Sequence, residues 1–123
     1  MKHWISKFRY AFAGIAWAFG SQSSFWVHLP VGIAVLCLSL WLRLDPLRCG
    51  VLVICIGIVI SAELFNSALE ALVQKLHPEH DLQIKRALDA GAAAVLVLAI
   101  AAVVVGLLLL GPPLWQRLVG GTA

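Results

Sequence analysis

Three long apolar stretches run along the chain, and short polar segments separate them. They cover Trp26 to Leu42, Leu47 to Ala62 with a continuation to Leu76, and Ala90 to Leu114. Each stretch is close to the ~20 residues that an α-helix needs to cross the hydrocarbon core of a bilayer. The pattern therefore predicts three membrane spans, contained in helices over residues 24–42, 47–76 and 82–114.

Residues 1–20 follow a different pattern, that of a helix with one apolar face. Trp4, Phe8 and Ile15 recur at steps of three or four residues, while Lys2 and Lys7 fall elsewhere on the helix. Such a helix lies in the plane of the membrane surface. The segment GSQSS at 20–24 contains a glycine and several cap-forming residues, which predict a break there and place position 22 at the surface.

Composition supports a membrane protein. Of the 123 residues, 62% are hydrophobic and only 12% are charged, and the mean hydropathy is +0.97. A chain this apolar does not form an ordinary soluble domain, and it is too short for two domains. We therefore expect residues 1–123 to form a single, all-α integral membrane domain.

The net charge of +3 comes from lysines and arginines near the ends of the apolar stretches, so nucleic acid is not the expected partner. Six lie on one side of the predicted membrane, namely Lys2, Lys7, Arg9, Lys75, Lys85 and Arg86. Three lie on the other side, namely Arg43, Arg48 and Arg117. The positive-inside rule then places the N-terminus in the cytoplasm and the C-terminus outside.

The segment SAELFNSALEA, at 61–71, introduces acids into the second apolar stretch. Glu63, Asn66 and Glu70 stand at i, i+3 and i+7, which puts them on one face of a helix. An ionised carboxylate at membrane depth costs several kcal/mol, so acids found there are usually functional. The alternative is a structural role, in which the polar groups hold helices together. For Asn66 alone, this structural role is the favoured interpretation.

Asp89 begins the third apolar stretch on the same side of the membrane, with Lys85 and Arg86 one turn earlier. We expect three carboxylates, an amide and two cations to converge there. Carboxylates suit Mg²⁺, and basic side chains suit the phosphates that carry it. One carboxylate free of metal would then act as a base.

Other functions fit the sequence less well. Ion conduction along the acids is disfavoured because the outer half of the second helix offers no polar continuation. His77 and His80 match no strong zinc pattern, and no Walker-type loop is present. A nucleotide would have to be bound in another way.

The stretch AELFNSALEALV, with DAGAAAVL beginning nineteen residues after Glu70, resembles the prokaryotic diacylglycerol kinase family, which includes the undecaprenol kinases. KFRYAFAGIAWAF and SFWVHL extend the resemblance to about residues 7–98. The resemblance implies a homotrimer of three-span subunits in the bacterial plasma (inner) membrane. It also implies transfer of the γ-phosphate of magnesium-ATP to the hydroxyl of a membrane lipid.

The resemblance also assigns roles to residues of this chain. Glu63 becomes the catalytic base, Asn66 its positioning neighbour, and Glu70 a Mg²⁺ ligand. Gln22 stands where the family has a second metal-binding Glu. The nucleotide site would comprise Tyr10, Glu79, His80, Asp81 and Asp89, with Lys85 or Arg86 supplying positive charge.

Three departures from the family pattern bear on this reading. Gln22 brings no charge to a metal, Leu88 replaces a lysine that precedes the Asp, and Gln74 replaces an acid one turn after Glu70. They motivate an alternative, in which the chain is a non-catalytic trimeric scaffold or lipid-binding relative of the family. The uniform apolar walls leave diacylglycerol and undecaprenol both open as acceptor lipids.

Overall fold

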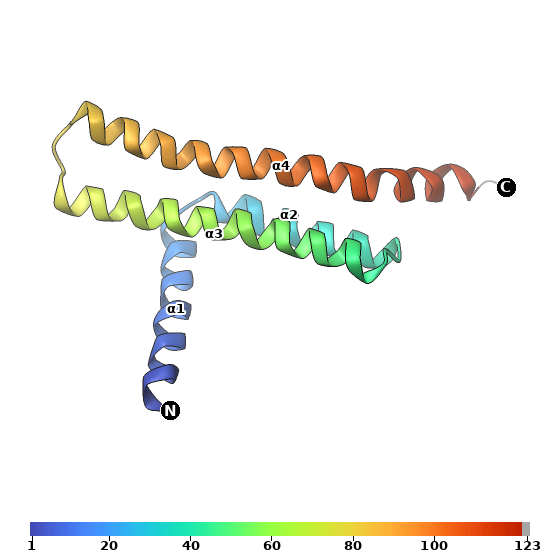
Figure 1. The fold of residues 1–123 in the computed structure, drawn as a ribbon, viewed down its shortest axis with the longest axis horizontal. Coiled ribbons are helices and arrows are strands. Elements are labelled where there is room, and N and C mark those ends of the chain that lie inside the picture. Colours follow the sequence, from blue (N-terminus) through green and yellow to red (C-terminus); the bar gives the residue numbers. More distant parts are fainter. Residues whose placement is uncertain (122–123) are drawn as a thin grey trace.

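The computed structural model describes residues 1–121, which form α-helices and no strand (Figure 1). The helices are α1 (Lys2–Ser21), α2 (Phe25–Trp41), α3 (Pro46–Leu76) and α4 (Leu82–Gly120). α3 and α4 form a long antiparallel hairpin, α2 packs beside α3, and α1 projects away from the other three (Figure 1). The all-helical prediction is confirmed.

Aspartate side chains cap the two long helices. At the start of α3, the Asp45 side chain accepts a hydrogen bond from the backbone N–H of Arg48 at 3.2 Å, and Pro46 occupies the first turn. At the start of α4, Asp81 accepts from the N–H groups of Gln83 and Ile84 at 2.8 and 3.1 Å. These contacts satisfy amides that have no partner within the helix.

α4 extends to Gly120, beyond the end expected at residue 114. Pro112 and Pro113 lie inside it. A proline removes only its own N–H and strains the turn before it, so the residues that follow can continue the helix. At 1.5 Å per residue α4 is ~58 Å long, which exceeds a ~30 Å hydrocarbon core.

The outer end of α4 is attached to the end of α2. Arg117 donates a 2.8 Å hydrogen bond to the backbone oxygen of Trp41, and its guanidinium carbon lies 4.2 Å from the centre of a Trp41 ring. The carbonyl is one of those left unpaired at a helix C-terminus. Arg117 therefore caps α2 while stacking on its last residue.

The apolar helices are those of a membrane protein. Within residues 1–121, α3 and α4 are each long and apolar enough to span a bilayer. α2 has 17 residues and is long and apolar enough to span a bilayer only when it is taken together with α1. The two helices are bent by 111° relative to each other. The structure thus contains two candidate spans, or three if that bent pair is counted.

Aromatic packing fixes the corner between α1 and α2. Phe25 is 0% exposed, and its ring centre lies 4.8 Å from that of Phe19. The indole N–H of Trp26 donates to the backbone oxygen of Phe19 at 3.2 Å, and Ala18 is buried beside the corner. Burial of a phenylalanine is worth roughly 1.5–3 kcal/mol. The corner consequently holds residues 22–28 against α3 in a defined position.

Gly91 of α4 lies close to the side chains of α3. A Cβ atom added at this position would lie 2.6 Å from Oδ1 of Asn66 and 3.5 Å from a methyl carbon of Leu69. The first distance is well inside van der Waals contact. Glycine at position 91 therefore leaves room for the Asn66 amide between the helices.

We predict that Gly91→Ala destabilises the fold by about 1–3 kcal/mol, because the new methyl group overpacks the helix contact. It should also displace the Asn66 side chain. Thermal unfolding in detergent micelles measures the effect. Gly57→Ala is the matched control, since no atom lies within 4 Å of its added Cβ, and it should be neutral or slightly stabilising. Equal midpoints for the two variants would contradict the prediction.

The Asp81 cap predicts a pH-dependent stability. Hydrogen bonds from the amides of Ile84 and Gln83 lower the pKa of Asp81 below its ordinary value of 3.8. Because the pKa is lower in the folded state, the carboxylate stabilises the fold above pH 3.8 and loses this contribution as the pH falls through the folded pKa. Asp81→Asn keeps a capping oxygen but does not titrate.

Wild-type protein should therefore be more stable than Asp81→Asn at about pH 7, and this advantage should shrink at about pH 3. Circular dichroism melts in the same detergent at both pH values check the prediction. A stability difference that does not change with pH would show that the charge of Asp81 has no part in capping α4.

Candidate functional site

The most buried acid is Glu63 on α3, whose side chain meets two residues of the α2 entrance. Glu63 is only 6% exposed. Ser24 Oγ donates to Glu63 Oε2 at 2.9 Å, and His28 Nδ1 lies 3.0 Å from Glu63 Oε1. Burial of a carboxylate is costly unless it is paired or hydrogen-bonded. Oε2 of Glu63 therefore has a hydrogen bond, and Oε1 has a close contact with an imidazole nitrogen.

Ser24 occupies the N-cap position of α2, but its side chain makes no capping hydrogen bond. The hydroxyl is directed at Glu63 instead. His28 lies four residues further along α2 and so shares a face of the helix with Ser24. On α3, Ser67 donates to the backbone oxygen of Glu63 at 2.8 Å. The corner thus presents a hydroxyl and an imidazole to a single carboxylate.

Glu70, two turns along α3, has a separate set of amide partners. Asn66 Nδ2 donates to Oε1 at 2.8 Å, and Gln22 Nε2 lies 3.4 Å from Oε2. Asn66 Oδ1 is buried and has no hydrogen-bond partner. The corner between α1 and α2 therefore brings Gln22 to Glu70, which lies 48 positions later in the chain.

The chemistry of this group suits one kind of metal ion. In residues 1–121, no group of three or more His, Cys, Asp or Glu side chains could hold a metal ion. These side chains alone therefore do not form a complete coordination sphere for a metal ion. Mg²⁺, however, is usually held by one or two carboxylates, with substrate phosphates and water filling its other positions. The Glu70 carboxylate fits that requirement, and Gln22, which presents Nε2 to Glu70, would offer its amide oxygen to a metal ion once the amide has turned over.

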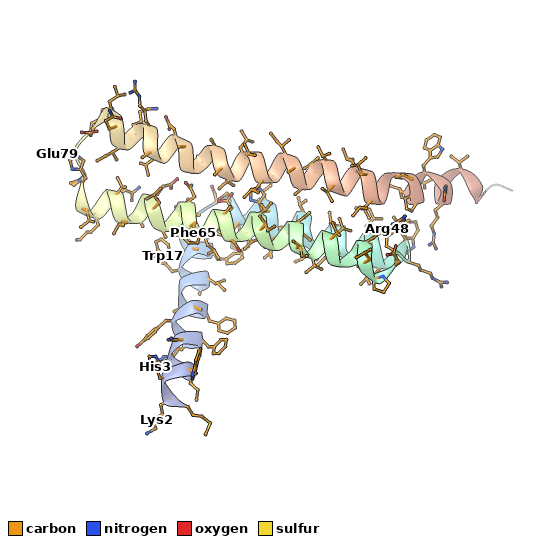
Figure 2. All side chains as sticks on the ribbon, in the orientation of Figure 1. Lys2, His3, Trp17, Arg48, Phe65 and Glu79 are labelled. Carbon is orange, nitrogen blue, oxygen red and sulfur yellow. The ribbon has the colours of Figure 1, made fainter. Side chains whose placement is uncertain are left out.

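A second region surrounds the loop between α3 and α4. A cavity of about 340 Å³ lies there, and Figure 2 shows Glu79 at this end of the hairpin, with Arg48 at the opposite end. Four of the predicted nucleotide residues line the cavity: Glu79, His80, Asp81 and Lys85. Leu88 and Gln74, two of the departures from the family pattern, line the same cavity.

The expected convergence of acids is partial. Asp89 accepts a 2.6 Å hydrogen bond from Lys85, and both side chains are more than half exposed on the first turns of α4. Tyr10 is exposed on α1, where the Arg9 guanidinium carbon lies 5.7 Å from its ring centre. Arg86 is exposed on α4. Gln22 and Asn66 hydrogen-bond to Glu70. Among the described residues, no hydrogen bond or ion pair joins Asp89, Tyr10 or Arg86 to Glu63 or Glu70.

Sequence analysis missed Ser24 and His28 as site residues. Ser24 was considered only as a helix cap, and His28 was given no role. The available signal was their spacing of four residues at the start of a helix, which places a hydroxyl and an imidazole on one face. Nothing in the spacing alone says that this face meets Glu63.

An apolar groove of about 500 Å³ runs along α2, α3 and α4 and reaches His28. The lining includes small residues at Gly32, Ala99, Ala102, Gly106 and Gly111, and larger apolar residues such as Leu52, Val59, Leu110 and Leu114. Because His28 contacts Glu63, the groove and the buried carboxylate are adjacent. Phe65 and Trp17 mark where α1 meets α3 (Figure 2).

Comparison with known proteins identifies the family of the chain. The sequence model of a family described as prokaryotic diacylglycerol kinase matches residues 9–110. The chain is 42% identical over 117 residues to a diacylglycerol kinase of Synechocystis, an alignment that covers 94% of this chain and 66% of that protein. The chain therefore spans slightly less than two thirds of the length of this relative.

Two other relatives are matched over most of their length. An undecaprenol kinase of Bacillus subtilis is 30% identical over 114 residues, which is 93% of either chain. A diacylglycerol kinase of Escherichia coli K12 is 33% identical over 104 residues, which is 82% of this chain and 83% of that protein. With the family model covering most of the chain, this protein belongs to the prokaryotic diacylglycerol kinase family.

Proposed function

We propose that the chain is a membrane lipid kinase, which transfers the γ-phosphate of ATP to the hydroxyl of diacylglycerol or undecaprenol. One observation carries the proposal. A buried carboxylate, Glu63, accepts a hydrogen bond from Ser24, lies 3.0 Å from His28 Nδ1 and adjoins an apolar groove that reaches His28. A lipid with its tail in the groove would present its hydroxyl to that carboxylate.

In the proposed reaction Glu63 is the general base. Its carboxylate removes the proton of the lipid hydroxyl, and the hydroxyl oxygen forms a bond to the γ-phosphorus of ATP. The bond from that phosphorus to the β–γ bridging oxygen breaks, and ADP leaves. Phosphoryl transfer depends mostly on positioning and charge, so the chain needs little covalent chemistry of its own.

Glu70 and Gln22 would hold Mg²⁺ carried on the triphosphate, which neutralises charge as the phosphate is transferred. The hydrogen bond from Asn66 orients the Glu70 carboxylate, and Gly91 leaves room for the Asn66 amide. The separation of Glu63 from Glu70 along α3 assigns the two acids to different tasks. The base has partners from α2, and the metal ligand has amide partners.

The loop cavity is the proposed nucleotide site. Glu79, His80 and Asp81 supply acceptors and donors on one wall, and Lys85 supplies positive charge. The hydrogen bond between Lys85 and Asp89 keeps this cation beside the first turns of α4, where a triphosphate would replace the carboxylate as its partner. Arg86 on α4 and Tyr10 on α1 complete the proposed set of nucleotide residues. The role of Tyr10 requires that the bound nucleotide reach α1.

Names of the relatives support a lipid acceptor, since they are diacylglycerol kinases and an undecaprenol kinase. We further propose a plasma-membrane homotrimer with α2 as a third span, a cytoplasmic N-terminus and an external C-terminus. The excess of lysine and arginine on α1 and on the adjoining ends of α3 and α4 supports this orientation. It places the nucleotide cavity in the cytoplasm.

A second candidate function is that of a non-catalytic scaffold or lipid binder. Leu88 favours it, because an apolar side chain in the wall of the loop cavity cannot contact phosphate. Gln22 favours it as well, because an amide brings no charge to a metal ion. The position of Glu63 favours the kinase, because a contact that only joined helices would not need a carboxylate next to a groove that can hold a lipid tail.

We predict that Glu63→Gln lowers phosphate transfer by at least about 100-fold, because an amide cannot accept the proton. The measurement is transfer from labelled ATP to diacylglycerol and to undecaprenol in separate assays. Asp45→Asn, the same change of carboxylate to amide at the outer turn, is the control and should retain full activity. No transfer to any lipid by wild-type protein would favour the scaffold.

We also predict that Gln22→Glu lowers the magnesium concentration needed for half-maximal rate by about tenfold, since it adds a charged oxygen beside Glu70. Titrations of magnesium at saturating ATP and lipid test this. Gln116→Glu, on the exposed outer part of α4, controls for the added charge. An unchanged magnesium requirement would place Gln22 outside the metal site.

A further inference from the structure

We infer that His28 is a positioning residue for the Glu63 carboxylate, acting together with the hydroxyl of Ser24. The inference rests on the proposed function, in which Glu63 is the base. It adds a requirement to that function: the base is aligned by side chains of another helix. In a chain of this kind a base held only by its own helix would be free to rotate.

The contacts of Glu63 support this role. Ser24 donates to Oε2 at 2.9 Å, and His28 Nδ1 lies 3.0 Å from Oε1. Nδ1 is buried and has no aligned hydrogen bond to any atom in the described residues. The short approach to Glu63 is therefore the polar contact that this nitrogen makes. Ser24 therefore constrains one carboxylate oxygen through a hydrogen bond, and His28 lies against the other.

The location of His28 adds a second argument. Its side chain is 26% exposed and lines the apolar groove, whereas the carboxylate that it contacts is 7% exposed. An acceptor hydroxyl that reaches Glu63 from the groove must therefore pass His28. The imidazole contacts both the base and the space that the lipid would occupy.

The energetic argument concerns alignment. A glutamate has several rotatable bonds, and a base displaced by about 1 Å can lose roughly 100-fold in rate. Ser67 holds only the backbone oxygen of Glu63, so α3 itself does not orient the carboxylate. Ser24 and His28, four residues apart on one face of α2, supply the missing constraint.

The alternative is that this pair merely attaches α2 to α3. A structural contact of that kind would affect unfolding and assembly, and it would affect the lipid and ATP steps equally. Loss of a positioning contact lowers kcat at saturating lipid and ATP while the protein remains folded. Such a loss causes no further decrease once the base has been removed.

The test compares His28→Ala, His28→Gln, Ser24→Ala and Ser24→Thr in the labelled-ATP assay with the lipid that wild-type protein phosphorylates. Ser39→Ala is the control, because Ser39 is also a buried serine of α2 and its hydroxyl bonds within the helix to the oxygen of Leu36 at 2.7 Å. Melting temperature and the KM for ATP are measured for each variant. His28→Gln and Ser24→Thr keep a donor where the alanine variants lose it.

We expect kcat to fall about 10-fold to 100-fold in His28→Ala and Ser24→Ala, with the KM for ATP unchanged and the protein still folded at the assay temperature. Ser24→Thr should restore most of the rate, and Ser39→Ala should match wild-type protein. Because His28 acts through Glu63, adding His28→Ala to Glu63→Gln should cause no further loss.

Three results would overturn the inference. One is a kcat within twofold of wild type in both His28 variants. Another is a loss of rate that follows a matching loss of melting temperature in His28→Gln as well as His28→Ala. The last is an additive loss in the double variant. Wild-type protein with no transfer to any lipid would instead refute the proposed function, and this role of His28 with it.

Discussion

Burial of the Glu63 carboxylate is the constraint on which the rest of the arrangement depends. A charged group taken from water needs compensating partners, and α3 supplies none for the side chain oxygens. The partners come from the start of α2, so α2 must begin where its first turn faces Glu63. The packing of Phe25 on Phe19 sets that starting point. The same corner brings Gln22 to Glu70, which makes one bend responsible for two groups of contacts.

Much of this was predictable from local sequence pattern. The spacing of Glu63, Asn66 and Glu70 depends only on helical periodicity, and the cap at Asp81 depends on residues beside it. The contacts of Ser24 and His28 were not predictable, since they join residues on different helices through a bend set by aromatic packing. The surface pair of Lys85 and Asp89, in contrast, joins residues four positions apart on one helix, a spacing that by itself favours an ion pair. The expectation that Asp89 would converge with Glu70 rested on local charge alone.

The departures from the family pattern now have distinct physical meanings. Gln22 reaches Glu70 despite having no charge, so the position is retained while its electrostatic contribution is weakened. Leu88 lies in the wall of the loop cavity, where the neighbouring Lys85 carries the nearest positive charge. One change alters the strength of an existing contact, and the other moves a charge by one helical turn. The two effects can be separated by mutating Gln22 and Leu88 independently.

Arg117 has a consequence for how a substrate reaches the groove. Its bond to the Trp41 carbonyl ties α2 to α4 about one turn beyond Leu38 and Leu114, the outermost groove residues on the two helices. The contact therefore lies beyond one end of the groove, and His28 lies near the other. For the proposed lipid substrate, this arrangement favours entry of the tail sideways between helices over entry past the Arg117 end. Such a route would let the proposed acceptor exchange by sideways diffusion in the leaflet while its head stays near Glu63.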